Sequence, residues 1–286
     1  MKNIKLAHSP DADDIFMYYA IKFGWITSEY NFLNKADDIE TLNQETLNNI
    51  WDVSAISFGL YPHIVDDYAI LRTAVSFGEG YGPKLIKMKG KKLKRNFKVA
   101  LSGKYTTNAL IFRLKYPDAR IKYYNFLDIE KAVLNGEVDA GVLIHESILT
   151  YDERLEVEAE IWDIWSELNK ENLPLPLGGM AIRRSIPLID AIKIEEILTK
   201  AVKVADTHKD LLSKMLIERN LVRVDSETLN KYLSLYANKD SISMSETQLK
   251  AINKLFELGY NAGYYDKKID VNECLLPREY KEIRFS

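Results

Sequence analysis

The chain has 286 residues, of which 47% are hydrophobic and 28% are charged, and its formal net charge is −3. This length predicts roughly two domains, and the composition is that of a soluble globular protein. The single cysteine, Cys274, excludes an internal disulfide and a thiolate metal cluster. The one basic run, residues 84–98, contains Gly90 and no clear aromatic stacking platform, which favours a solvated loop over a nucleic-acid site.

The N-terminal residues Met1 to Pro10 lead directly into a strand pattern and lack the apolar run and cleavage site of a signal peptide. Nowhere does the chain approach the roughly 18 apolar residues of a transmembrane helix. We therefore expect a cytoplasmic protein without a membrane partner, which argues against an exported transport receptor.

The first strand is predicted at residues 4–7, and the segment His8-Ser9-Pro10 then opens a helix that stops at Gly24. Ser9 suits the N-cap, and proline suits the first helical position. The helix dipole favours carboxylates in the first turn, where the sequence has Asp11, Asp13 and Asp14. Three carboxylates exceed what a cap needs, so a polar binding role and a plain cap both stay open.

A second helix is predicted over residues 37–49, where apolar residues recur at helical spacing. A short strand over 53–56 follows, and Ser57 begins the turn out of it. Another short strand is predicted at 69–71. Ser57 thus follows the C-terminal end of a strand, where open α/β sheets bind their ligands.

The strand at 69–71 leads to a loop that contains several glycines, Phe77 to Pro83. Gly80 and Gly82 allow the backbone of this loop to approach a ligand closely. The glycine spacing is not a dinucleotide-binding fingerprint, because the run Leu85-Ile86 predicts a strand after the loop rather than a helix.

Strands and helices then alternate from residue 97 to residue 144, with strands at 97–101, 121–124 and 138–144 and helices at 108–116 and 127–134. This β-α-β-α-β order implies a parallel sheet with right-handed crossovers. Thr106 and Thr107 open the first of these helices after Gly103. Free backbone N–H groups at such a helix N-terminus bind anions, although a plain threonine cap is the alternative.

The last of these strands ends in the apolar run Ala140 to Ile144, and His145 is the first polar side chain after it. A central strand of an open α/β sheet ends at the crevice where ligands bind. Histidine is the usual general acid or base near neutral pH. His145 is therefore a catalytic candidate, although it would also suit the cap of the next helix.

The second half of the chain begins with a candidate strand at 153–158 and an amphipathic segment at 161–165. Two prolines and two glycines precede an apolar strand within Asn172 to Ile182, which suggests a crossover. Helical spacing then dominates, at residues 189–205, 211–219, 226–236 and 245–258.

These elements predict an α/β protein of two lobes with a central cleft and a helical C-terminal region. Residues 1–90 and 180–286 would form a discontinuous first lobe that includes the C-terminal helices, and residues 91–179 would form the second. The candidate polar groups come from both lobes, as a closing binding site requires.

A series of motifs across residues 4–185 resembles, in the same order, the 1,4-dihydroxy-6-naphthoate synthase family of the futalosine route to menaquinone. The motifs are Ser9-Pro10 with Asp14-Ile15-Phe16, Asp38 to Asn43, Ile56-Ser57, Gly80-Tyr81-Gly82-Pro83, Gly103 to Thr107, Gly141 to Ser147 with Thr150-Tyr151, and Leu173 to Gly179. The resemblance implies a periplasmic-binding-protein-like (type II) fold.

The same resemblance implies a carbon–carbon lyase that converts a small molecule, cyclic dehypoxanthinylfutalosine, without a metal or an organic cofactor. His145 matches the general base of the family, and Thr106 and Thr107 would hold the substrate carboxylate. The sugar hydroxyls would be bound by Asn43, Ser57 and Asp14, and the remaining substrate-binding positions would be Ser9, Gly80 and Gly82. No nucleic-acid partner is implied, and the second lobe or the C-terminal helices offer a surface for a homodimer.

The chain departs from the family pattern Ser-Pro-Cys-Pro-Asn-Asp, because it reads Ser9-Pro10-Asp11-Ala12-Asp13-Asp14. Aspartate in place of asparagine at position 13 removes two amide donors, which indicates a variant substrate contact. A solute-binding protein of the same fold and a chorismate dehydratase of the same pathway are the alternatives. The absence of a secretion signal and the presence of His145 favour the lyase.

Overall fold

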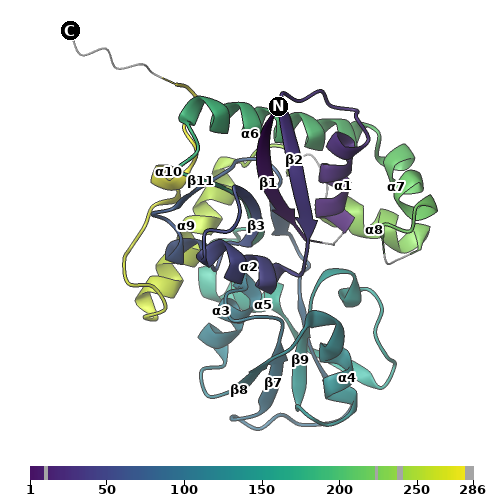
Figure 1. The fold of residues 1–286 in the computed structure, drawn as a ribbon. Coiled ribbons are helices and arrows are strands. Elements are labelled where there is room, and N and C mark those ends of the chain that lie inside the picture. Colours follow the sequence, from purple (N-terminus) through teal and green to yellow (C-terminus); the bar gives the residue numbers. More distant parts are fainter. Residues whose placement is uncertain (10–11, 223–224, 237–240, 281–286) are drawn as a thin grey trace.

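A computed structural model describes residues 1–9, 12–222, 225–236 and 241–280. The described chain forms two lobes, each built around its own β-sheet (Figure 1). The two-lobed α/β arrangement predicted from the sequence is therefore confirmed. Among the described residues, no helix has both the length and the apolar character to cross a membrane.

Sheet A, in the first lobe, has the strand order β2-β1-β3-β11-β4, with β5 also paired to β11. Its strands are β1 (Lys2–His8), β2 (Tyr30–Ala36), β3 (Val53–Ser57), β4 (Tyr68–Ile70), β5 (Ser76–Gly78) and β11 (Leu175–Arg183). β1 pairs in parallel with β2 and β3, whereas β11 is antiparallel to each of its partners.

Sheet B, in the second lobe, has the order β10-β6-β9-β7-β8. Its strands are β6 (Lys84–Met88), β7 (Lys98–Leu101), β8 (Arg120–Tyr123), β9 (Ala140–Leu143) and β10 (Leu155–Glu160). The parallel pairing predicted for residues 97–144 is confirmed, because β7 is parallel to β8 and β9. The complete sheet is mixed, because β6 is antiparallel to β9 and β10.

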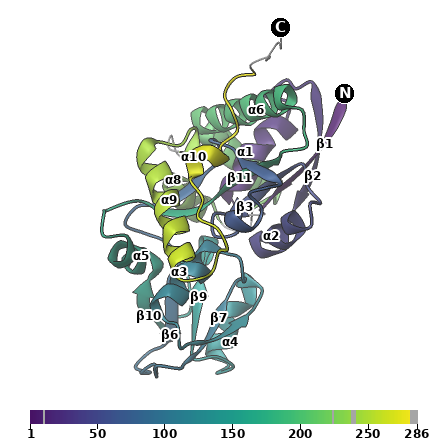
Figure 2. The ribbon, with the colours of Figure 1, turned by 90° about the vertical axis from the view of Figure 1, so that its left-hand side faces the viewer.

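The helices cover both sheets and gather in the first lobe toward the C-terminus (Figures 1 and 2). They are α1 (Ala12–Lys22), α2 (Ile39–Leu47), α3 (Thr107–Lys115), α4 (Ile129–Leu134), α5 (Ile161–Asn169), α6 (Leu188–Thr207), α7 (Lys209–Glu218), α8 (Ser226–Tyr236), α9 (Glu246–Asn261) and α10 (Val271–Cys274). Leu255 and Phe256 of α9 belong to the same buried core as Val99 and Phe112 of the second lobe. This buried core is therefore continuous across the two lobes.

Two local predictions differ from the structure. No strand was predicted at β2, where polar residues such as Asn31 and Lys35 interrupt the apolar pattern of a strand at the edge of the sheet. Pro176, Gly178 and Gly179 lie within β11 instead of before it, and a register shift between Pro176 and Gly178 accommodates them.

Other predictions stay open. The proposed lobe boundaries at residues 90 and 179 stay predictions, although the chain passes from sheet A to sheet B between Gly78 and Lys84. Pro10 and Asp11 lie outside the described residues, as does the side chain of Asp13.

Candidate active site

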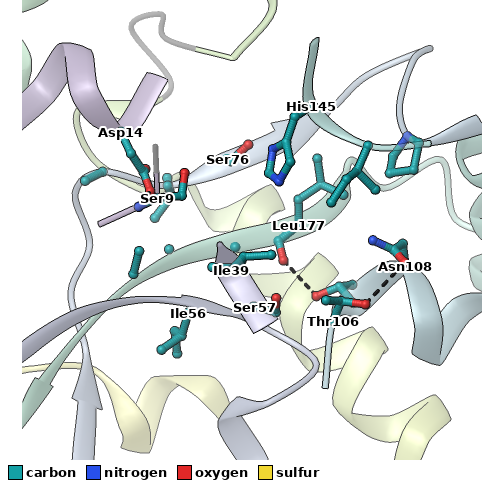
Figure 3. Close-up of a pocket in the computed structure, with 18 residues that line it drawn as sticks. Ser9, Asp14, Ile39, Ile56, Ser57, Ser76, Thr106, Asn108, His145 and Leu177 are labelled. Atoms are coloured by element: carbon teal, nitrogen blue, oxygen red, sulfur yellow. Dashed lines mark hydrogen bonds between the residues drawn. The ribbon is translucent and has the colours of Figure 1, made fainter. Parts of the chain in front are cut away.

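A cavity of about 820 Å³, counted with its opening to solvent, lies between the two lobes (Figure 3). Strands of sheet A and segments next to the strands of sheet B contribute to its wall. Its polar lining residues are Ser9, Asp14, Ser57, Ser76, Thr106, Thr107, Asn108 and His145, and its apolar part includes Ile39, Ile56, Pro83, Ile144 and Leu177. The cavity therefore brings together most of the side chains that the sequence indicated.

Strand ends place these side chains. Ser9 follows β1, Ser57 is the last residue of β3, and His145 follows β9. Thr106 stands between the end of β7 and the start of α3. Because the C-terminal ends of parallel strands meet at one edge of each sheet, the side chains that follow them converge on the cleft.

His145 follows β9 and begins a short 3₁₀ helix, His145–Ile148. Its backbone has φ = 55°, a left-handed conformation that is uncommon for residues other than glycine. Its ring makes a T-shaped contact with the ring of Phe126 at a centroid distance of 5.0 Å, and Figure 3 shows the imidazole pointing into the cavity. Strained backbone of this kind is often found at functional sites.

The N-terminus of α3 forms another part of the wall. Thr106 is the N-cap, and its hydroxyl accepts from the backbone N–H of Ala109. The Thr107 hydroxyl donates to the carbonyl of Leu177 (2.7 Å) and accepts from the N–H of Gly59 (2.9 Å). Its hydrogen is thus used within the protein, which leaves the backbone N–H groups of Thr107 and Asn108, ahead of the capped Ala109, to face a ligand.

Asn43 does not line the cavity and is fully buried below it. Its Nδ2 donates to Oγ of Ser57 (3.1 Å), and its Oδ1 accepts from the N–H of Ser57 (3.0 Å). Because the Ser57 hydroxyl accepts from Asn43, its own hydrogen is left to donate toward the cavity. Asn43 thus orients Ser57 rather than reaching the cavity itself.

Ser9 and Asp14 lie at another end of the cavity, and the N–H of Ser9 donates to Oδ2 of Asp14 (2.8 Å). Beside them, His8 is buried, with Nδ1 2.8 Å from the carbonyl of Ser9 and Nε2 3.3 Å from Nδ2 of Asn34. An amide nitrogen only donates, so this pattern fits a neutral imidazole that carries its proton on Nδ1.

Neither Gly80 nor Gly82 lines the cavity. Gly80 is exposed and has φ = 75°, and a side chain at Gly82 would meet Leu175 at 2.8 Å. They therefore shape the loop between β5 and β6. The sequence also gave no sign of two polar lining residues, Ser76 and Asn108, because neither occupies a recognisable cap or motif position.

Glu40 of α2 joins the first lobe to the loop before α3. Its Oε2 accepts from the backbone N–H of Tyr105 (3.0 Å), and Gln44 donates to Oε1 (2.8 Å). Burial raises the pKa of Glu40 above its usual range, although these hydrogen bonds oppose the shift. A Cβ at Gly103 would overlap this carboxylate, so the close contact between Glu40 and the loop requires glycine at position 103.

The cavity thus combines an imidazole, several hydroxyls and the start of a helix, within a partly apolar wall. Such a set suits proton transfer on a bound organic anion. Among the described residues, no group of three or more His, Cys, Asp or Glu side chains is arranged to hold a metal ion.

Comparison with known sequences gives consistent results. The model of a family described as menaquinone biosynthesis matches residues 4–261. A Thermus thermophilus protein named 1,4-dihydroxy-6-naphthoate synthase is 28% identical over 262 residues, which cover 90% of this chain and 93% of the relative. A Streptomyces coelicolor protein of the same name is 26% identical over 259 residues, 88% of this chain and 91% of the relative.

Solved structures support the same fold. A crystal structure of a protein from Archaeoglobus fulgidus matches with a TM-score of 0.85 and 34% identity, over 92% of this chain and 98% of that chain. The periplasmic aliphatic sulphonate binding protein of Escherichia coli matches with a TM-score of 0.66 and 13% identity, over 100% and 96%. The periplasmic-binding-protein-like fold predicted from the sequence is therefore confirmed.

Proposed function

The chain belongs to the menaquinone biosynthesis family, and we propose that it is the lyase that forms 1,4-dihydroxy-6-naphthoate from cyclic dehypoxanthinylfutalosine. One observation carries the proposal. The cavity between the lobes is lined both by an imidazole, His145, and by a helix N-terminus that suits a carboxylate. The substrate of this reaction has both a proton to lose and a carboxylate to be held.

In the proposed reaction His145 acts as the general base. The proton that it takes starts an elimination, which opens the spiro-type ring and releases the naphthoate with a sugar-derived fragment. The ring contact with Phe126 fixes the imidazole plane, and the apolar neighbours Ile144 and Pro83 limit water beside it. A positioned base of this kind accelerates proton transfer by about 100- to 10,000-fold.

The remaining polar groups would hold the substrate in one pose. The start of α3 faces the carboxylate, while Ser57, with its hydroxyl oriented by Asn43, donates to an oxygen of the sugar. Asp14 accepts from another hydroxyl at the opposite end of the cavity. Fixing both ends of the substrate sets the distance from its acidic proton to the imidazole.

The direct test is incubation of the purified protein with cyclic dehypoxanthinylfutalosine under anaerobic, neutral conditions, with mass detection of the naphthoate. We expect product to form without an added metal or organic cofactor. If the compound binds but is not converted, the chain is a solute-binding protein of the same fold.

A further inference from the structure

Asn108, the second residue of α3, faces the cavity with a side chain that the protein itself uses only in part. It is 6% exposed, and its Oδ1 lies 3.2 Å from the hydroxyl of Thr106, which donates to it. No acceptor among the described residues takes a hydrogen bond from its Nδ2. Figure 3 shows the amide nitrogen turned toward the cavity.

This nitrogen lies at a position where a ligand anion is favoured. The N–H groups at the start of a helix have no partner within the helix, and the helix dipole adds positive potential there. The threonine hydroxyls beside it already bond to protein atoms. The single hydrogen of Thr106 is shared between Oδ1 of Asn108 and the carbonyl of Gly103, each at 3.2 Å. Thr107 donates to the carbonyl of Leu177. Asn108 is thus the side chain in this turn whose donor hydrogens remain for a ligand.

The other residues that line the cavity also favour an anion at the Asn108 end. Within the described part of the chain, no lysine or arginine lines the cavity, so a carboxylate has no cationic partner there. Asp14 lies at the opposite end of the cavity from Asn108 in Figure 3, and its charge would repel an anion. A buried amide donor beside a helix N-terminus is therefore a favourable place for a negative group.

We propose that Asn108 is a specificity-determining residue, which selects a substrate carboxylate through its side-chain amide together with the first backbone N–H groups of α3. The proposal rests on the proposed function, because it names the part of the substrate that this end of the cavity holds. The resemblance assigned the side-chain contact with the substrate carboxylate to the hydroxyls of Thr106 and Thr107, and we assign it to the amide of Asn108 instead.

The test compares binding of 1,4-dihydroxy-6-naphthoate with binding of its methyl ester, in the wild type and in Asn108→Asp, by calorimetry under anaerobic conditions. The wild type should prefer the acid, and Asn108→Asp should weaken acid binding about 10- to 100-fold while ester binding changes far less. KM for the substrate should rise in parallel, with a smaller effect on kcat. Asn125→Asp, the same change at an exposed helix cap in the second lobe, should leave every value unchanged.

Asn108→Ala provides a second variant if the aspartate impairs folding, and it too should lose the preference for the acid. Equal binding of acid and ester by the wild type, or an unchanged preference in both variants, would overturn the role of Asn108. A wild type that converts no substrate and binds neither compound would instead overturn the proposed function.

Discussion

The backbone N–H of Gly59 donates a 2.9 Å hydrogen bond to the hydroxyl of Thr107, and the two residues belong to different lobes. A Cβ at position 59 would lie 3.1 Å from Cα of Thr107, so glycine allows this approach. On the other side, the Tyr265 hydroxyl donates to the carbonyl of Gly59 (2.9 Å). The start of α3 is therefore bonded to Gly59 of the first lobe, and Gly59 is itself held by the segment that follows α9.

Thr107→Val should weaken this connection. Valine keeps the shape but removes the hydroxyl, which leaves the buried N–H of Gly59 and the carbonyl of Leu177 without this partner. We expect the free energy of unfolding to fall by about 1–3 kcal/mol, measured by urea denaturation. Thr107→Ser, which retains the hydroxyl, is the matched control, and equal stability of the two variants would contradict the assignment.

His145→Gln should abolish turnover and spare binding. The amide has nearly the size of imidazole but does not accept a proton, so kcat should fall by about 100-fold or more. Stabilisation of the protein by the substrate, measured by thermal unfolding, should persist. His208→Gln changes an exposed histidine outside the cavity and should keep full activity. Near-normal turnover by His145→Gln would rule out the base.

Asn43→Asp should weaken substrate binding although residue 43 does not line the cavity. An ionised aspartate still accepts from the N–H of Ser57 but also attracts its hydroxyl hydrogen, which is then lost to the ligand. KM should rise about tenfold in steady-state kinetics. Asn48→Asp, an exposed change that follows the same helix, serves as the control. An unchanged KM would show that Ser57 does not donate to the substrate.

Gly103→Ala tests the contact of Glu40 with the loop before α3. The added methyl group would overlap the carboxylate, so we expect a loss of about 1–3 kcal/mol in unfolding free energy. In a Glu40→Gly background, which also removes the Cβ that would lie 2.5 Å from the added methyl group, the same substitution should cost much less. Additive effects in this double-mutant cycle would mean that the two residues do not interact.

The raised pKa of Glu40 predicts a pH dependence of stability. Burial is the main cause, so the folded protein holds this proton more tightly than the unfolded chain does. The associated stability is fully present below the unfolded pKa, about 4.3, and is lost as the pH rises through the folded value. Wild type should therefore lose stability relative to Glu40→Gln as the pH increases from about 4 to 7. Chemical denaturation across this range should show that trend, and a constant difference would refute it.

Local sequence patterns predicted the features that depend on residues adjacent in the sequence, such as strand ends and helix starts. The apolar run before His145 and the threonines after Gly103 indicate a strand end and a helix start, and the structure has both. The role of Asn43 could not be read from sequence, because it depends on a contact with Ser57 that forms only when α2 packs on β3. Asn108 was missed for a similar reason, since its exposure to the cavity depends on how the lobes meet.

The position of β11 has a consequence for synthesis of the chain. β11 lies between β3 and β4, so sheet A stays incomplete until residue 183 has left the ribosome. All strands of sheet B lie between residues 84 and 160, and they emerge earlier. The middle of the nascent chain can therefore close its sheet first, while the N-terminal strands lack a partner strand that is encoded more than 100 codons after β4.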